Sequence, residues 1–443
     1  MTLVDLDDFD AVGQAAYALA KRLFPICRSI TGNGVRQTLA IVREWLPELN
    51  VHEVPTGTAA FDWEVPKEWN IRNAYVMDAA GNRIIDWKEH NLHVMGYSVR
   101  VDREMTLEEL QEHLYSLPDQ PDAIPYVTSY YAKRWGFCLT DNRRKQLRPG
   151  MYRVFIDSTL EPGSLTYADL LLPGESQEEV LLSTYLCHPS MANNELSGPV
   201  VTTMLVRWLL TLAKRRYSYR VVFVPETIGS IVYLSRHLDE MKRNTVAGFN
   251  ISCVGDNRAY SLLHSRLGAT LADRVAQCVL RHHCPDFVEY SFLARGSDER
   301  QYCSPGVDLP VVSVMRSKYG TYPEYHTSLD DLTLISPEGL SGAYDVLRQC
   351  LAALEGNYRY KVQCLCEPQL GRRGLYPTLS TRTSDTSVST MMDFIAYCDG
   401  NHDVVEIAEK LGVPPHKLLA IAATIGNMTD NGGPTPVLLP VRQ

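Results

Sequence analysis

The 443-residue chain lacks a long apolar run, because none reaches the roughly 18 residues that cross a bilayer. Its first eight residues are acidic, whereas a signal peptide begins with basic ones. We therefore predict a cytoplasmic protein without a membrane partner.

Positive charge is scarce as well. The chain has 43 Lys and Arg against 52 Asp and Glu, a net charge of -9. Proteins that hold nucleic acid through bulk charge carry an excess of basic residues. We therefore expect no nucleic-acid partner.

Paired cysteines are missing too. The eleven cysteines are odd in number and scattered, and Cys187 and Cys253 lie inside apolar, strand-like segments. This usage is typical of reduced thiols in a cytosol rather than of a disulfide framework. Cys364 and Cys366 are close-spaced, but they have no second pair with which to hold zinc, and we interpret them as core or linker thiols.

The order of apolar segments predicts the architecture. Residues 9–48 are expected to be helical, with a break near 31–34, and residues 51–150 show the short runs and Pro/Gly punctuation of β structure. From residue 153 onward, continuous apolar strands alternate with helices, which indicates an α/β core with a mostly parallel mixed sheet and helices on both faces. The predicted parts are the core (1–50 and 151–366), an inserted β-rich domain (51–150), and a linker with a winged-helix-like module (367–443).

Three polar residues follow predicted strands or the loops after them: His188, Glu226 and His326. In open α/β sheets, ligands gather beyond the carboxyl ends of the strands. Two imidazoles are suitable zinc ligands, and a catalytic zinc lowers the pKa of its water to about 7. We predict a metal centre with Glu226 as general base, which would pass a proton to a leaving amine. Taken singly, Glu226 could be a carboxylate that merely stabilises the N-terminus of a helix through the helix dipole, and either histidine could be structural.

The motifs occur in an order that resembles the zinc aminopeptidase clan, which includes glutamyl cyclases. These motifs are His188, Asn194-Glu195-Leu196-Ser197-Gly198, Glu226, Ser297-Asp298-Glu299-Arg300-Gln301-Tyr302 and Tyr325-His326-Thr327. More closely, the segments 23–32, 61–66 and 121–126 resemble a bacterial family of aminopeptidase-like proteins. Members of that family have an inserted β domain and a C-terminal winged helix, and often belong to polysaccharide or natural-product biosynthesis clusters. The resemblance covers nearly the whole chain and implies a zinc-aminopeptidase-like core.

The chain departs from the clan at the carboxylates of its two-metal site. The resemblance implies acidic residues at four positions that are here Ser190, Asn194, Thr227 and Ser252. An amide has no charge and bridges two cations poorly. We therefore expect one zinc ion per chain, or another divalent metal. The ion would be held by His188 and His326 together with Glu195, Asp256 or both.

Other polar residues are candidates for substrate binding. Asn194 lies in the motif, and Arg316, Lys318 and Tyr319 precede His326, where they could bind an anionic group. A solvated loop explains the last three equally well. Arg28, Arg295 and Arg300 are weaker candidates of the same kind.

The C-terminal region predicts short helices at 391–398, 404–411 and 417–425, with a tight turn at 412–415, the outline of a winged helix. Its candidate recognition helix has only His416 and Lys417 as basic groups, fewer than phosphate contacts require. We predict a role in packing or in a homo-oligomer rather than in DNA binding.

These observations favour a metal-dependent, aminopeptidase-like hydrolase of an amide or peptide bond in a small molecule or peptide, and the resemblance implies a place in natural-product or polysaccharide biosynthesis. One alternative is an N-deacylase of a small amino sugar or biosynthetic intermediate. Another is a non-hydrolytic binding or assembly protein, which the lost carboxylates favour and the retained Glu226 argues against.

Overall fold

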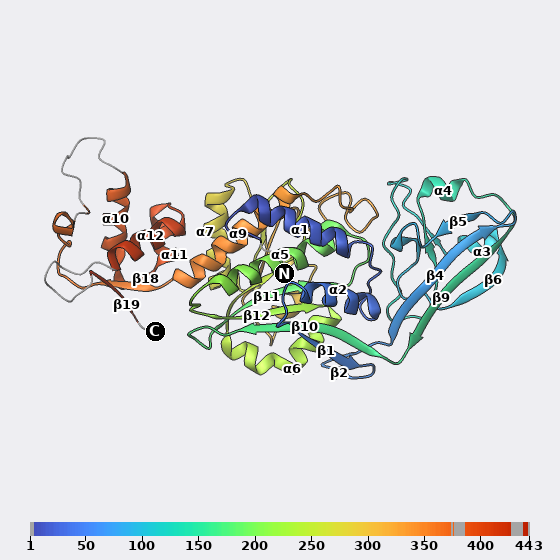
Figure 1. The fold of residues 1–443 in the computed structure, drawn as a ribbon, viewed down its shortest axis with the longest axis horizontal. Coiled ribbons are helices and arrows are strands. Elements are labelled where there is room, and N and C mark those ends of the chain that lie inside the picture. The colour runs from blue at the N-terminus through green and yellow to red at the C-terminus, as the bar shows by residue number, and fades with distance from the viewer. Residues whose placement is uncertain (1–3, 374, 376–385, 427–436, 442–443) are drawn as a thin grey trace. The chain divides into compact units, whose positions relative to one another are not determined.

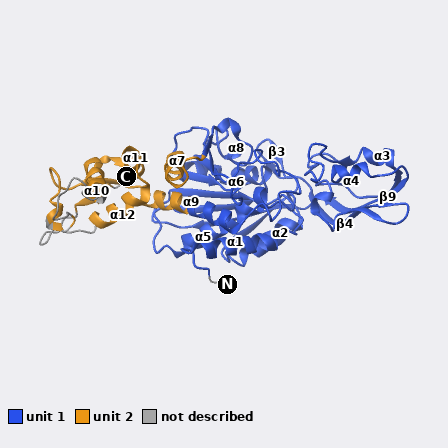
Figure 2. Cartoon of the chain, turned by 90° about the horizontal axis from the view of Figure 1, so that it is seen from above, with its two compact units in different colours: residues 1–272, 288–345 blue, residues 273–287, 346–443 orange. Residues whose placement is uncertain are grey.

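The computed structural model describes residues 4–373, 375, 386–426 and 437–441. The chain divides into two compact units, residues 1–272 with 288–345 and residues 273–287 with 346–443, which Figure 2 colours separately.

An eight-stranded sheet forms the centre of the first unit (Figure 1). Its four middle strands, β12, β11, β13 and β16, run parallel. At one side β10 pairs antiparallel with β12 and β1 antiparallel with β10, and at the other side β14 pairs antiparallel with β16. In sheet order the strands are β1 (Asn50–Pro55), β10 (Ser164–Leu172), β12 (Ser218–Val224), β11 (Glu179–Tyr185), β13 (Thr245–Asn250), β16 (Val311–Met315), β14 (Ser261–Leu263) and β15 (Val288–Tyr290). The predicted mixed, mostly parallel sheet is confirmed.

Helices cover both faces of this sheet. α1 (Phe9–Leu23), α2 (Asn33–Arg43) and α5 (Ser197–Thr211) lie on one face, and α6 (Ile228–Asn244) lies on the other (Figure 1). Every residue of β11 and β12 is buried, which explains why these strands are continuous apolar runs rather than alternating ones. The other helices include α7 (Leu271–His283), α8 (Glu299–Tyr302), α9 (Pro337–Gly356), the short helices η1 (Asn91–His93) and η3 (Phe292–Ala294), and the π-helix η2 (Ala192–Leu196).

The inserted β-rich domain is built on a four-stranded antiparallel sheet in the order β5-β4-β9-β6. These strands are β5 (Arg83–Asp86), β4 (Glu68–Asp78), β9 (Met151–Glu161) and β6 (Val101–Thr106), with β7 (Leu114–Tyr115), β8 (Phe137–Cys138), α3 (Leu107–Gln111), α4 (Asp141–Lys145) and the hairpin of β2 (Ala59–Ala60) and β3 (Trp63–Glu64) nearby in sequence. The predicted bounds of 51–150 need correction at both ends. β1 pairs with β10 of the central sheet, and β9 pairs along its whole length with β4, so the inserted sheet runs from residue 68 to 161.

The second unit has a three-stranded sheet and three helices that match the predicted ones. The strands are β18 (Asp399–Asp403), β17 (Arg359–Val362) and β19 (Leu438–Pro440), and the helices are α10 (Thr386–Tyr397), α11 (Val404–Leu411) and α12 (Pro415–Gly426), with η4 (Leu370–Arg373) before them. Because β17 joins this sheet, the module begins before the predicted residue 367. Of the predicted linker that begins at 367, residues 374 and 376–385 lie outside the described residues. Within the described chain, no helix combines the length and apolar character of a membrane span.

Candidate active site

His188 lies just after β11, and a carboxylate fixes its orientation. Its ring Nδ1 donates to Oε2 of Glu195 at 2.9 Å, and Glu195 is fully buried on η2. Arg28 donates to the His188 carbonyl at 3.1 Å, and its Nε lies 3.5 Å from Oε1 of Glu195. Burial opposes a charged ring, but Cys187 and Glu195 outweigh it and raise the pKa of His188 well above its usual value. Because Nδ1 is engaged by Glu195, Nε2 is the atom that faces Glu226, and a cation would have to displace its proton in order to bind there.

Glu226 and His326 meet His188 as predicted. Oε2 of Glu226 lies 3.5 Å from Nε2 of His188, and the ring centroids of His188 and His326 are 5.3 Å apart. Burial and the neighbouring His188 lower the pKa of His326 to about 3, so its ring is neutral near pH 7 and can offer a lone pair. Burial raises the pKa of Glu226, while His188 and Arg300 act against the rise.

The turn that carries Glu226 is strained and supported from behind. Thr227 has φ 65°, a left-handed conformation that costs a β-branched residue energy. Its backbone N–H donates to Oδ1 of Asp298 at 2.7 Å, and Ser230 Oγ donates to the same oxygen at 2.8 Å. Burial and then Glu226 raise the pKa of Asp298 to about 7. Asp298, part of the Ser297–Tyr302 motif, therefore positions Glu226 without lining the cavity itself.

The three residues open into a cavity of about 380 Å³, a size typical of small-ligand sites. Its walls are largely aromatic, and the hydroxyls of Tyr126 and Tyr130 lie 2.6 Å apart. The ring of Tyr126 lies 5.0 Å from that of His188 and 5.2 Å from that of His326. Sequence reasoning missed this wall, which consists of Trp63, Tyr126, Tyr130 and Tyr131. The only signal was that Trp63 lies in the segment 61–66 and Tyr126 in the segment 121–126.

The donors present fit one divalent cation rather than two. His188 and His326 bring two imidazoles to one cavity, with their ring centroids 5.3 Å apart. Two ions would need bridging charge, but the amide of Asn194 donates to the Tyr185 hydroxyl at 2.9 Å instead. Cys187, His188 and Glu195 also lie within coordinating reach of each other, but this arrangement would use Nδ1, which already donates to Glu195.

Two of the predicted metal ligands have other roles. Asp256 is wrong as a ligand, because its carboxylate accepts hydrogen bonds from Asn193 Nδ2, from Arg258 N, and from both the backbone and hydroxyl of Ser317. These bonds hold it in a loop network. Glu195 lies behind His188, where it orients the ring.

The predicted anion-binding residues turn inward. Arg316 donates to the Asp256 carbonyl at 2.8 Å and to Asn257 at 2.7 Å, and it packs over the Tyr260 ring. Lys318 Nζ donates to the Tyr319 carbonyl at 3.1 Å, and the Tyr319 hydroxyl donates to Glu299 at 2.6 Å. These contacts do not place Arg316, Lys318 or Tyr319 in the cavity wall.

Among the weaker arginine candidates, Arg300 lines the cavity and donates to Thr227 Oγ1 at 2.6 Å. Arg28 is committed to Glu195 and His188, and Arg295 packs over the Phe292 ring. Asn194 is buried, and no described group hydrogen-bonds to its Oδ1. It therefore stands beside the site rather than in the cavity wall.

The pattern of a family described as a domain of unknown function, DUF4910, matches residues 17–357, and that of a winged helix-turn-helix matches residues 358–428. The chain belongs to the first of these families. The match at 358 agrees with β17 as the start of the C-terminal module.

Known proteins share the whole arrangement or its core. A protein of Clostridium acetobutylicum, named as a candidate polysaccharide biosynthesis protein with an aminopeptidase-like domain, is 46% identical over 403 residues, 90% of this chain and 92% of that one. A crystal structure of a candidate peptidase from the same species is 42% identical, with a TM-score of 0.91 over 98% of both chains. A zinc aminopeptidase from Bacillus subtilis, 12% identical with a TM-score of 0.57 over 77% of this chain and 94% of that one, shares the fold. The expected aminopeptidase-like core with a C-terminal winged helix is confirmed.

Proposed function

We propose that the chain hydrolyses an amide bond in a small substrate with the help of one divalent cation, most simply zinc. The observation that carries the proposal is the meeting of His188, Glu226 and His326 at one cavity. The aminopeptidase-like relatives and the zinc aminopeptidase fold support it.

His188 and His326 would hold the cation, with the Glu226 carboxylate beside it. When bound, such an ion supplies a Lewis acid and a water with a pKa near 7. Glu195 keeps His188 in the tautomer that presents Nε2, which is the usual arrangement behind a metal-binding imidazole.

The other groups of the cavity suit an amide substrate. Glu226, whose pKa burial raises, can take a proton and return it to a leaving amine. The paired hydroxyls of Tyr126 and Tyr130 can donate to an oxygen on which negative charge develops. The aromatic walls exclude water and accept an apolar group, and the volume limits the substrate to about one or two residues.

The test combines metal analysis with a screen of amino-acid anilides and N-acyl amino sugars. We expect about one ion per chain and cleavage by the wild type. Glu226→Gln should lower kcat by about 10²–10⁴-fold while the ion remains bound, because glutamine keeps an oxygen donor but cannot carry the proton. Glu48→Gln, an exposed carboxylate on another surface, should change neither value.

Each alternative predicts a different result. Loss of the ion together with activity in Glu226→Gln would make Glu226 a metal ligand. Cleavage of N-acyl amino sugars alone would favour a deacylase, which the polysaccharide biosynthesis name of the Clostridium relative supports. A wild type that binds no metal and cleaves nothing would overturn the proposal in favour of a binding protein.

A further inference from the structure

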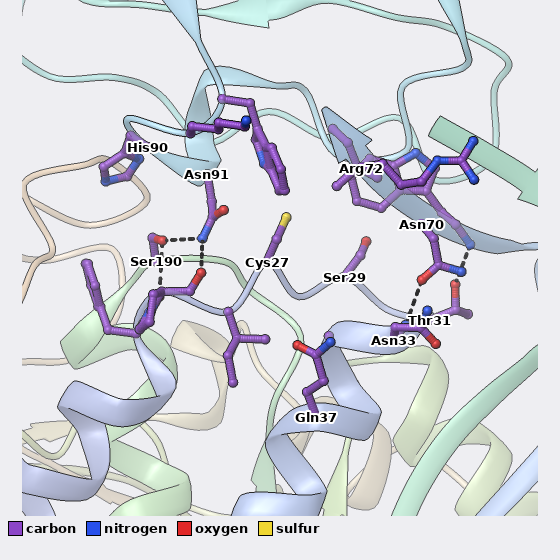
Figure 3. Close-up of a pocket in the computed structure, with 18 of the residues that line it drawn as sticks. Cys27, Ser29, Thr31, Asn33, Gln37, Asn70, Arg72, His90, Asn91 and Ser190 are labelled. Carbon is purple, nitrogen blue, oxygen red and sulfur yellow. Dashed lines mark hydrogen bonds between the residues drawn. The ribbon is translucent and has the colours of Figure 1, made fainter. Parts of the chain in front are cut away.

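A second and larger cavity, about 860 Å³, lies in the first unit beside the loop that precedes α2 (Figure 3). Its lining comes from that loop and α2, from β4, and from the segment that leads into η1. The volume lies within the range of about 300–1,000 Å³ that is typical of small-molecule sites. None of its lining residues belongs to the lining of the hydrolytic cavity.

The wall of this cavity is polar, and all but one of its charged side chains are paired. Arg72 is held by both carboxylate oxygens of Asp157, at 2.9 and 2.8 Å, and Glu89 lies 3.3 Å from Arg143. Burial and then His93 lower the pKa of His90 to about 4, so that ring is neutral at physiological pH. Lys88 also lies in the lining, where it is exposed and has no ion pair among the described residues, but one solvated lysine holds a phosphate or a carboxylate only weakly.

Several hydrogen-bonding groups in the wall remain available. Within the described residues, no hydrogen bond engages the Ser29 hydroxyl, the Gln37 amide or Oδ1 of Asn91. Figure 3 shows Ser29 and Cys27 pointing into the cavity, with Gln37 and Asn91 at its sides. Hydroxyls and amides both donate and accept, as the hydroxyl groups of a sugar do.

Two tryptophans complete the lining. Trp69 is buried, stacked on Tyr97 and committed through its indole N–H to the Ser98 carbonyl at 2.9 Å, whereas Trp87, in the segment before η1, is partly exposed. Flat apolar surfaces of this kind pack against the C–H face of a sugar ring, while neighbouring polar groups bind its hydroxyls.

The cavity adjoins the residues that hold the candidate active site. Cys27 and Ser29 line it, whereas Arg28 between them contacts His188 and Glu195. The gap toward the hydrolytic cavity is lined by Tyr126 and Tyr130, and its volume is about 10 Å³, room for about one water. A ligand in the larger cavity would therefore stay there, in contact with the segment behind His188.

We propose that this cavity binds a neutral saccharide of one or two rings. The ring packs on the face of Trp87, and its hydroxyls bind Ser29, Gln37 and Asn91. This binding does not depend on hydrolysis, so it stands or falls independently of the proposed function.

The test is saturation-transfer NMR on the full-length protein with glucose, galactose, N-acetylglucosamine, N-acetylgalactosamine and maltose, with glucuronate as an anionic comparison. We expect at least one neutral sugar to bind at millimolar concentration and glucuronate to bind more weakly than glucose. Ser29→Ala and Gln37→Ala each remove a group with no described partner, so the fold should survive. Each should weaken binding about two- to twelvefold, the effect of one lost hydrogen bond.

Gln14→Ala is the matched control, because Gln14 is an exposed amide on α1 outside the cavity. It should leave binding unchanged. The proposal is overturned if none of the neutral sugars binds. It is also overturned if the sugar binds equally well to the Ser29 and Gln37 variants, or if Gln14→Ala weakens binding as much as they do.

Discussion

Glu195 supplies the carboxylate behind His188, whereas the resemblance to the zinc aminopeptidase clan implies an acidic residue at position 190. Ser190 instead accepts a hydrogen bond from Asn91 at 2.8 Å, while Glu195 reaches the ring from the π-helix η2. Glu195 and Arg28 are both buried, so each charge needs the other as its counter-ion, and Glu195 contacts the His188 ring as well. The orienting acid of this site therefore comes from η2 and not from position 190.

Replacing Glu195 should weaken metal binding without removing a metal ligand. We expect Glu195→Gln to lower zinc affinity about 10- to 100-fold, the usual effect of losing the partner behind a metal-binding imidazole. It should also lower the free energy of unfolding by about 3–5 kcal/mol, because Arg28 keeps a buried charge without its counter-ion. Competition with a chelator measures the affinity, and urea denaturation measures the stability.

Glu179 gives the matched control, because it is also buried and pairs with Arg220 at 2.6 Å. Glu179→Gln should destabilise the fold through Arg220 and leave zinc affinity unchanged. If both variants lose affinity equally, the effect comes from general destabilisation, and the orienting role of Glu195 is wrong.

The residues of the site could be predicted only where strand ends determine them. His188 and Glu226 follow buried strands, so their meeting with His326 at one edge of the sheet was predictable. Glu195 was assigned to the metal because the sequence does not show that a π-helix will direct it to the far side of the ring. Asp256 failed because its partners come from loops whose paths no periodicity encodes.

At the scale of elements, the boundary between helices α11 and α12 rests on one glycine. Gly412 has φ 62° at the end of α11, and a Cβ built there would meet no described atom within 4 Å. Replacing Gly412 with another residue type would therefore cost energy through the backbone conformation and not through a steric clash. The turn predicted at 412–415 from glycine and proline alone was correct for this reason.

Gly412→Ala should lower the stability of the C-terminal module by about 1 kcal/mol, the cost of a left-handed conformation in a residue with a Cβ. The measurement is the urea midpoint of the full-length protein, followed by circular dichroism. Gly426 at the end of α12 is the control, since a Cβ there also meets no described atom and its φ is not positive. Gly426→Ala should leave the midpoint unchanged or raise it. Equal losses in both variants would contradict the conformational explanation.

Sheet membership was harder to predict than the strands themselves. β1 and β9 read as strands, but nothing in their alternation says which sheet each will join. Pairing is set by register with distant partners, here β10 for β1 and β4 for β9. The predicted insertion bounds were therefore displaced at both ends, although the fold class was right.

At the scale of the whole first unit, an ion-pair cluster joins the inserted sheet to the core. Arg36 on α2 donates to Glu68 of β4 at 2.7 Å and to Glu53 of β1 at 3.0 Å. The cluster thus connects a core helix, the edge of the central sheet and the start of the inserted one. Arg36 lowers the pKa of Glu68 to about 2.

The stability that Glu68 contributes should depend on pH in a defined direction. Because its pKa is lowered in the folded state, its contribution is full above the unfolded value near 4.5 and is lost as pH falls toward 2. Glu68→Gln should therefore lower the melting temperature at pH 7, by an amount limited by the partial exposure of the cluster, and this deficit should shrink as pH falls from about 4.5 toward 2. Glu44→Gln, which removes the fully exposed pair with Arg22, should have a smaller effect at pH 7. A Glu68→Gln deficit that persists unchanged at pH 3 would show that packing, not charge, joins the two sheets.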